Sequence, residues 1–373
     1  MKLKQILPLT LSCIMGITTA LDANEIHAFI GTYTQGTSKG IYSTTLDLET
    51  GTLGPVSLAA EATDPSFLAL APDLKSLYAI NESGGRLRAF AIGPNHALRP
   101  LNDLPTDAGY PADLGVDPSG SMVIGAIYGS GAVVGFPILK DGSLGKRSVL
   151  VRHSGKSVNI SRQEAPHAHG VTFSRDGRFL VIPDLGIDQV RVYAVDAANA
   201  QIKPAPRDHL AIEPGSGPRH AVFSKDGKFL YVINELFSTI TVASFNAKNG
   251  ALTTRQTVST LPADFAGQST TAEIALHPNG NYVYGSNRGH DSVAQFSRDR
   301  KSGKLTLLGI TPTGGKNPRN FAITPDGRWL IAANQDSNSL FVFRIDGTSG
   351  ALTVASGPVS VPRPVCVRFL SYP

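Results

Sequence analysis

Two neighbouring segments of this sequence combine charged side chains with imidazole and amide groups. Arg219-His220 stands just before one apolar run, and Asn234-Glu235 closes a second one. A guanidinium group binds carboxylate or phosphate through paired N–H donors. A carboxylate among cations stays ionised, and an imidazole exchanges protons near neutral pH. These residue types suit a site that holds an anionic ligand and performs acid–base chemistry on it.

The segment that carries these residues, 217–235, is one copy of a repeat. Each copy has an apolar run, an Asp/Asn-Gly-like turn and a second apolar run. The positions equivalent to the turn glycine are 74, 120, 177, 227, 280 and 327, with spacings of 46, 57, 50, 53 and 47 residues. A third alternating run and a weaker fourth run follow, as in 240–246 and 251–258. Four short strands in about 50 residues are typical of a β-propeller blade. The other copies are 71–82, 117–128, 174–185, 277–288 and 324–335.

The two ends of the chain supply the parts of one more blade. Residues 364–372 resemble an innermost strand, 26–33 a second strand and 40–47 a third. No segment keeps a 3.6-residue period over three turns, which excludes a helical solenoid. We therefore predict an all-β fold: one domain, residues 24–373, forming a seven-bladed β-propeller whose seventh blade is closed by strands from both termini. This closure leaves no sheet edge exposed.

The repeat predicts where the polar residues meet. The first and last residues of a hairpin lie at one end, opposite its turn, and all blades share one orientation. The open ends should therefore form a ring around the axis on one face. Five of the nine histidines (the fifth being His27) and three arginines belong to these ends, which favours a functional site. The residues expected there are His167, His169, Asp184, Arg219, His220, Asn234, Glu235, Arg288, His290, Asp291, Arg319 and Asn320.

A metal site is the main chemical alternative at this ring. His167 and His169 are two residues apart and share one face of a strand, and Glu164 or Asp184 could complete a zinc site. The nearby arginines disfavour a dication, so we predict neither a metal nor a cofactor. The sequence also has no nucleophile-elbow motif for serine catalysis.

Composition narrows the class of partner. The chain of 373 residues is 41% hydrophobic and 17% charged, and its net charge of +5 is scattered without a basic run. A role in binding nucleic acid or a membrane surface is therefore disfavoured. A small-molecule ligand remains the expected partner.

The N-terminus predicts export. Lys2 and Lys4 precede an apolar stretch over 6–19, and small residues follow at Ala20 and Ala23. This is the layout of a signal peptide, residues 1–20, with cleavage after Ala20 or Ala23. A buried N-terminal helix is the alternative, although proline at position 8 argues against it. We expect a periplasmic or secreted protein whose one remaining cysteine, Cys366, is a core residue without a disulfide partner.

Several motifs together resemble a known family. They are FIGTYTQGTSKGIY (29–42), PHAHGVTFSRDGRFLVIPDLGIDQVRVY (166–193), GPRHAVFSKDGKFLYVINE (217–235), SNRGHDSVAQF (286–296) and NPRNFAITPDGRWLIAANQDSNSLFVF (317–343). The sequence is similar to the seven-bladed propeller lactonases, which include bacterial 6-phosphogluconolactonase and the fungal 3-carboxy-cis,cis-muconate lactonizing enzyme. The resemblance implies a metal-free lactone site on one face. By motif, its working residues correspond to His169 (or His167), Arg219, Glu235 and Arg288.

The expected function is hydrolysis of an anionic sugar lactone, with 6-phosphogluconolactone as the leading substrate. Arg219 and Arg288 would bind the anion and the developing oxyanion. Glu235, or a histidine that it orients, would take the proton of water, and another histidine would protonate the ring oxygen. The family's phosphogluconolactonases are cytoplasmic whereas this chain carries an export signal, so the substrate stays open. The alternatives are a cycloisomerase or lactonase for another carboxylated lactone, and a non-catalytic propeller that binds a protein or glycan.

Overall fold

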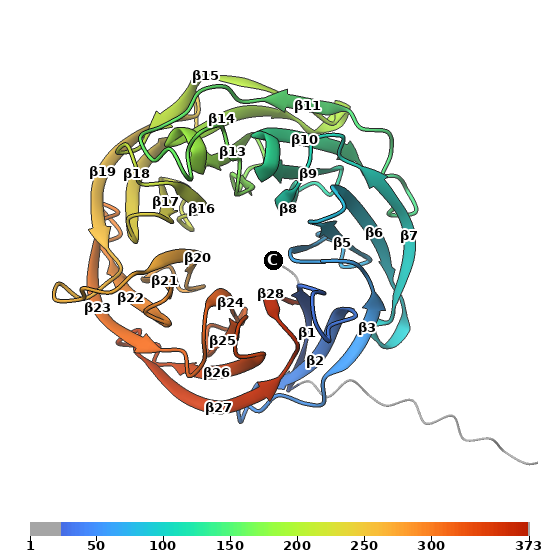
Figure 1. Cartoon of the computed structure of the whole chain (residues 1–373), viewed down its shortest axis with the longest axis vertical. Helices are drawn as coiled ribbons and strands as arrows, with labels where there is room; N and C mark the ends of the chain where they lie inside the picture. Colours follow the sequence, from blue (N-terminus) through green and yellow to red (C-terminus); the bar gives the residue numbers. More distant parts are fainter. Residues whose placement is uncertain (1–23, 372–373) are drawn as a thin grey trace, which may run out of the picture.

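The computed structural model describes residues 24–371, so the expected signal peptide lies outside the described residues. This part of the chain forms seven four-stranded antiparallel sheets around a central axis. The first strand of each sheet lies near the axis and the fourth at the rim (Figure 1). The predicted all-β, seven-bladed propeller is confirmed. Between residues 24 and 371, no helix is long and apolar enough to cross a membrane.

The sheet that joins the termini, called the closing blade below, has the strand order β28 (Pro364–Phe369), β1 (Glu25–Thr32), β2 (Gly40–Asp47), β3 (Ser57–Glu61). The next two sheets are β4 (Leu68–Leu70), β5 (Ser76–Asn81), β6 (Arg86–Ile92), β7 (Leu98–Pro105), and β8 (Pro111–Val116), β9 (Met122–Ile127), β10 (Ala132–Pro137), β11 (Val149–Arg152). Then come β12 (Thr172–Phe173), β13 (Phe179–Asp184), β14 (Gln189–Asp196), β15 (Gln201–Ala211), and β16 (Pro218–Phe223), β17 (Phe229–Asn234), β18 (Thr239–Asn246), β19 (Ala251–Ser259).

The last two sheets are β20 (Thr270–Leu276), β21 (Tyr282–Arg288), β22 (Ser292–Arg298), β23 (Leu305–Pro312), and β24 (Pro318–Ile323), β25 (Trp329–Asn334), β26 (Ser339–Ile345), β27 (Leu352–Ser360). Four single-turn 3₁₀ helices lie in the connections: η1 (Pro94–His96), η2 (Tyr128–Ser130), η3 (Leu185–Ile187) and η4 (Ala197–Asn199).

The predicted hairpins are present, and their turns explain the repeat. The glycine-equivalent positions all have positive φ, between 59° at Leu74 and 76° at Gly327. Glycine adopts this left-handed conformation without a steric penalty, which is why it recurs at these turns. In the β16–β17 turn, Ser224 also accepts the Phe229 N–H at 2.9 Å and donates to Asp226. The turn and its hydroxyl–carboxylate pair therefore fix the register of this hairpin, and Ser174–Asp176 and Thr324–Asp326 form the same pair in two others.

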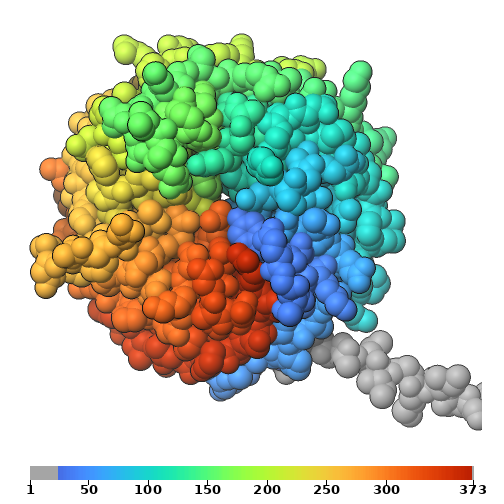
Figure 2. All heavy atoms as spheres, in the orientation of Figure 1, coloured from blue at the N-terminus to red at the C-terminus, as the bar shows by residue number. Residues whose placement is uncertain are grey.

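The closing blade forms as predicted from both ends of the chain. β28 pairs antiparallel with β1, so that Ile30 lies opposite Val367, and β1 pairs in turn with β2. Figure 2 shows the N-terminal segment, in blue, packed directly against the C-terminal segment, in red. The ring is thus closed by backbone hydrogen bonds between residues more than 300 positions apart in sequence.

One expectation about the ring of polar residues is wrong. His27 stands at the beginning of β1, which is the second strand of its blade, and only the end of a second strand reaches the open face. The His27 carbonyl accepts the Leu370 N–H at 2.8 Å, at the far end of β28. Its ring packs on His96 with the two centroids 4.4 Å apart. His27 therefore lies at the turn end of the propeller.

Aromatic side chains lock adjacent blades together. Where the ring closes, the Trp329 indole N–H on β25 donates to the Leu48 carbonyl at 3.0 Å. Gly51, in the β2–β3 turn, has φ of +73°, and a Cβ there would come within 2.4 Å of the Trp329 ring. The hydroxyls of Tyr231 and Tyr284 donate to glycine carbonyls of the next blade at 3.0 and 2.9 Å. These contacts bury both faces of the second strands, which explains why β17 and β25 are apolar along almost their whole length.

The strand that closes the ring should be sensitive to a buried charge. Val367 on β28 is fully buried, whereas Val354 on the outer strand β27 is 54% exposed. We expect Val367→Asp to lower the free energy of unfolding by at least about 3 kcal/mol, because its carboxylate would be desolvated without a partner. Val354→Asp should change it by less than about 0.5 kcal/mol. Urea denaturation followed by circular dichroism measures both, and equal effects would contradict the closure.

Candidate active site

A cavity of about 370 Å³ opens at the face formed by the open ends of the hairpins. This is a common size for a small-molecule site. Side chains from several blades converge on it because each hairpin delivers its first and last residues to the same ring. The lining residues are Glu82, Tyr110, Ala112, Tyr128, Arg162, His169, Glu235, Thr270, Arg288 and Arg319. Four residues of the predicted set therefore reach the cavity: His169, Glu235, Arg288 and Arg319.

The Glu235 carboxylate is held by three guanidinium groups. Its Oε1 lies 2.6 Å from Nη2 of Arg162, and its Oε2 lies 3.1 Å from both Nε of Arg219 and Nη2 of Arg288. Burial alone would raise the pKa of Glu235, yet the three cations together lower it to about 2. The carboxylate is therefore ionised at neutral pH and organises the cations around it.

Arg219 lies behind the cavity lining, in a buried chain of polar groups. Its Nη1 donates to the Ala272 carbonyl at 2.6 Å and lies 3.2 Å from Nε2 of His220. The other ring nitrogen of His220 lies 3.1 Å from the Glu273 carboxylate. Burial lowers the pKa of His220 despite that carboxylate. A neutral His220 thus donates from Nδ1 to Glu273 and accepts from Arg219 at Nε2, so it fixes the guanidinium in place.

This buried series of hydrogen bonds and ion pairs corrects one part of the expected mechanism. We expected Glu235 as a base or as the group that orients a histidine. The structure gives both Glu235 oxygens to guanidinium groups, and the histidine-orienting carboxylate is Glu273. The physical reason is electrostatic. Glu235 is the carboxylate that lies within ion-pair distance of the three arginines. His220 instead contacts the carboxylate of Glu273.

His169 is the imidazole that faces the cavity. Within residues 24–371 neither of its ring nitrogens has a hydrogen-bond partner, and Nδ1 is fully buried. Nε2 is consequently the nitrogen that is open to the cavity. Burial, followed by the charges of Arg219 and its neighbours, holds the pKa of His169 well below its usual value of 6.5. The ring is therefore neutral at physiological pH and free to accept a proton.

His167 supports the wall of the cavity. Its ring stacks on Tyr128 with the centroids 4.3 Å apart, and its Nδ1 lies 2.8 Å from the Tyr128 carbonyl. Its Nε2 lies 3.2 Å from Glu164. Tyr128 in turn contacts the edge of the His169 ring, at 5.6 Å between centroids. Of the two candidate histidines, only His169 lines the cavity.

Several other predicted residues are engaged in the protein framework. Asp184 accepts the backbone N–H of His167 at 2.7 Å, and its second oxygen lies 2.6 Å from Nδ1 of His153. Asn234 donates to two threonine hydroxyls of its own blade at 2.9 Å. Both side chains shape the hairpin ends on which the cavity residues stand.

Of the remaining predicted residues, three lie outside the cavity lining and one, Arg319, faces the cavity. Asp291 accepts the Asn317 N–H at 2.8 Å, and His290 lies 2.7 Å from the Ser292 hydroxyl, both in connections outside the cavity lining. Asn320 bonds to Glu273 and to the Val367 N–H, deep in the channel. Arg319 faces the cavity, with its guanidinium carbon 5.4 Å from the centre of the Tyr33 ring.

The donor set at this face does not resemble a zinc site. Among residues 24–371, no group of three or more His, Cys, Asp or Glu side chains is clustered as metal ligands. His167 and Asp184, which the metal alternative would use, are committed to Tyr128 and to His153.

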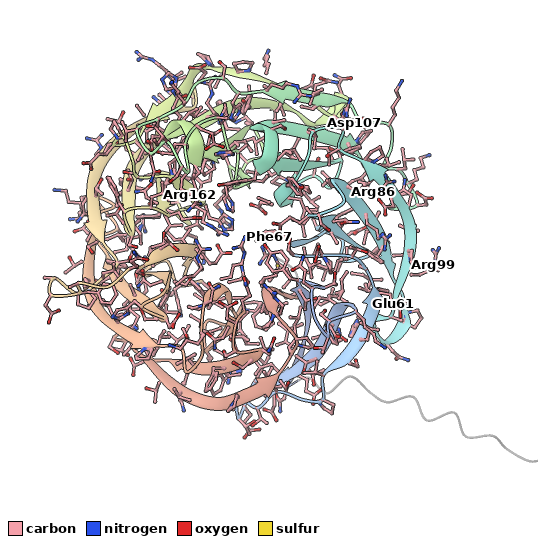
Figure 3. All side chains as sticks on the ribbon, in the orientation of Figure 1. Glu61, Phe67, Arg86, Arg99, Asp107 and Arg162 are labelled. Carbon is pink, nitrogen blue, oxygen red and sulfur yellow. The ribbon has the colours of Figure 1, made fainter. Side chains whose placement is uncertain are left out.

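Sequence reasoning missed Arg162 as a site residue. It belongs to the long connection between β11 and β12, and Figure 3 shows it on the inner side of the ring. In the same view Arg86, Arg99 and Asp107 lie toward the rim. The available signal was the spacing of 57 residues between the turns at 120 and 177, the longest in the repeat. An insertion of this kind can return a side chain to the site, but alignment of the blades does not place it.

Comparison with known proteins identifies the family. The sequence model of the family described as "Lactonase, 7-bladed beta-propeller" matches residues 27–369 of this chain. The chain belongs to this lactonase family. The resemblance inferred from the motifs is confirmed, and the protein is a lactonase of the hydrolase class.

Similar proteins align with nearly the whole length of this enzyme. A 6-phosphogluconolactonase of Bacillus subtilis is 36% identical over 345 residues, which are 92% of this chain and 97% of the relative. A candidate 6-phosphogluconolactonase structure from Bacteroides fragilis gives a TM-score of 0.88 at 35% identity, covering 94% and 99% of the two chains. A periplasmic gluconolactonase structure from Pseudomonas aeruginosa gives 0.87 at 32% identity, covering 94% and 100%.

The ion cluster predicts how acid affects stability. The pKa of Glu235 falls from 4.5 to about 2 on folding, so its contribution is complete above pH 4.5 and is lost as the pH falls toward 2. This contribution is about 3 kcal/mol. We expect Glu235→Gln to be less stable than the wild type at pH 7, with the gap narrowing between pH 4.5 and 2. Urea titrations at each pH measure this difference in the free energy of unfolding, with the exposed Glu49→Gln as control. A gap that does not depend on pH would contradict the cluster.

Proposed function

We propose that the enzyme hydrolyses an anionic sugar lactone, with 6-phosphogluconolactone, which gives 6-phosphogluconate, as the principal substrate. The single observation that carries this proposal is the charge of the cavity. Three guanidinium groups, from Arg162, Arg288 and Arg319, and two carboxylates, from Glu82 and Glu235, line the cavity, so its lining carries one positive charge in excess, and Arg219 lies directly behind Glu235. A phosphate monoester carries nearly two negative charges at neutral pH and would be attracted to these cations. The activity of the Bacillus subtilis relative supports the same choice.

The reaction follows from the neutral imidazole and the cations beside it. Water attacks the lactone carbonyl carbon while Nε2 of His169 accepts the proton of that water. The carbonyl oxygen becomes an oxyanion that Arg288 and Arg319 stabilise. When the carbonyl reforms, the bond to the ring oxygen breaks, and that oxygen takes the proton back from His169. The product is the open-chain hydroxy acid, which releases one proton on ionising.

The buried residues act through these groups. Glu235 holds Arg288 and Arg162 at the cavity wall, and Arg219 holds Glu235 from behind. His220 and Glu273 fix Arg219 in turn. We further propose that no metal takes part, because a dication would be repelled by the excess of guanidinium groups.

A second candidate substrate is the unphosphorylated gluconolactone. The N-terminal 1–20 segment has the pattern of a signal peptide, and the Pseudomonas aeruginosa neighbour is a periplasmic gluconolactonase. We propose that the enzyme is exported to the periplasm or secreted, like that neighbour, which makes its type of lactone a candidate substrate.

The substrate choice is tested by a comparison of lactones. Proton release above the spontaneous rate is measured with 6-phosphogluconolactone, glucono-δ-lactone and a muconolactone, with and without EDTA. We expect the highest kcat/KM for the phosphorylated lactone and no effect of EDTA. Glu235→Gln should abolish most of the activity while circular dichroism stays unchanged. Faster hydrolysis of gluconolactone would favour the second candidate, and acceleration of none would contradict the proposed function.

The role of His169 predicts a pH profile. Because burial holds the pKa of this base well below 6.5, kcat/KM should stay level from pH 7 to 6 and fall only at lower pH. The sign follows because the base is active when neutral. We expect His169→Gln to lower kcat by about 10²- to 10⁴-fold. The exposed His209→Gln, on the outer strand β15, is the control and should keep full activity. A wild-type profile that falls through pH 7 would contradict the assignment.

A further inference from the structure

The cavity has a second carboxylate whose surroundings differ from those of Glu235. Glu82 follows β5, and its Oε2 accepts hydrogen bonds from the hydroxyls of Tyr33, at 2.9 Å, and Ser66. Its Oε1 has no hydrogen-bond partner in the described part of the chain. Among residues 24–371, no Lys, Arg or His nitrogen lies within 4 Å of this carboxylate, so no ion pair neutralises it. One oxygen is therefore fixed by the protein and the other is left for a ligand.

The two donors to Glu82 are themselves fixed. The Tyr33 ring packs against two guanidinium groups, with those of Arg319 and Arg363 at 5.4 and 5.7 Å from its centre. Burial raises the pKa of Tyr33 to about 12, so its hydroxyl stays protonated and donates to Glu82. Ser66 is 5% exposed. The carboxylate is thus preorganised and does not need to move when a ligand arrives.

The chemistry of this carboxylate selects what it can bind. It repels a phosphate or carboxylate group, which the guanidinium groups of Arg162 and Arg288 attract instead. A carboxylate oxygen accepts hydrogen bonds only, and hydroxyl groups are the donors that an uncharged part of a sugar offers. The cavity therefore offers guanidinium groups to the anion and a carboxylate oxygen to hydroxyl groups.

We propose that Glu82, held by Tyr33 and Ser66, recognises the hydroxyl groups of the substrate and makes the enzyme selective for polyhydroxylated lactones over lactones without hydroxyls. This inference rests on the proposed function, which it deepens by naming the substrate class. Glu82 is a specificity-determining residue that lines the same cavity as Arg162 and Arg288 but forms no ion pair with them.

The test is a binding comparison that does not require turnover. Isothermal titration calorimetry measures the Kd of gluconate, a six-carbon polyhydroxy acid, and of hexanoate, a six-carbon acid without hydroxyls. We expect the full-length wild type to prefer gluconate and Glu82→Gln to weaken gluconate binding about tenfold, because a hydrogen bond to a charged acceptor is lost. Hexanoate binding should change less than about twofold. Tyr33→Phe should cause a smaller loss with the same selectivity.

The control and the contrary outcomes are defined by the same measurements. The control is Glu61→Gln. Glu61 is exposed and lies near the rim of the ring (Figure 3), so this substitution should leave both Kd values unchanged. No preference for gluconate in the wild type, or equal losses for both acids in Glu82→Gln, would overturn the inference. Failure of the proposed function is a separate result: no lactone would be hydrolysed, whatever the preference for gluconate.

Discussion

The pairing of β28 with β1 is the constraint on which the rest of this structure depends. No single blade delivers more than three residues to the cavity, so the site exists only when the hairpins face one axis. Backbone hydrogen bonds between the two ends of the chain keep the ring closed, with Ile30 opposite Val367. The Trp329–Leu48 hydrogen bond and the close packing of Gly51 reinforce the same junction. A ring held in this way can keep like charges close together without opening.

The enzyme uses that rigidity to place cations that repel one another. Four guanidinium groups converge at one end of the channel, and Glu235 bridges three of them. Burial, reinforced by the charges of Arg219 and Arg319, keeps the pKa of His169 low and its ring neutral. The closed ring offsets the electrostatic repulsion between these guanidinium groups. As a result, the base His169 and the anion-binding arginines line the same cavity. Glu82 is set apart from this cluster by hydrogen-bonding to hydroxyls alone.

Much of this arrangement could be predicted from the repeat. The turn at Gly227 and its five equivalents gave the blades, and hairpin geometry correctly brought His169, Glu235, Arg288 and Arg319 to one face. Arg162 could not be placed, since it lies in an insertion that the repeat does not describe. His27 was misplaced although 26–33 was correctly predicted as a second strand, because only the end of a second strand reaches the open face and His27 lies near the beginning of β1.

The sequence by itself determined the architecture, the family and the ring of candidate residues, because strand periodicity and turn chemistry are local properties that repeat along the chain. The tertiary structure alone decided which carboxylate pairs with which cation. The repeat does not distinguish the roles of Glu235, which follows β17, and Glu273, which lies in β20, yet one neutralises arginines and the other orients His220. Such partnerships depend on side chains from different blades meeting across the channel, at distances of a few ångströms that no repeat pattern encodes.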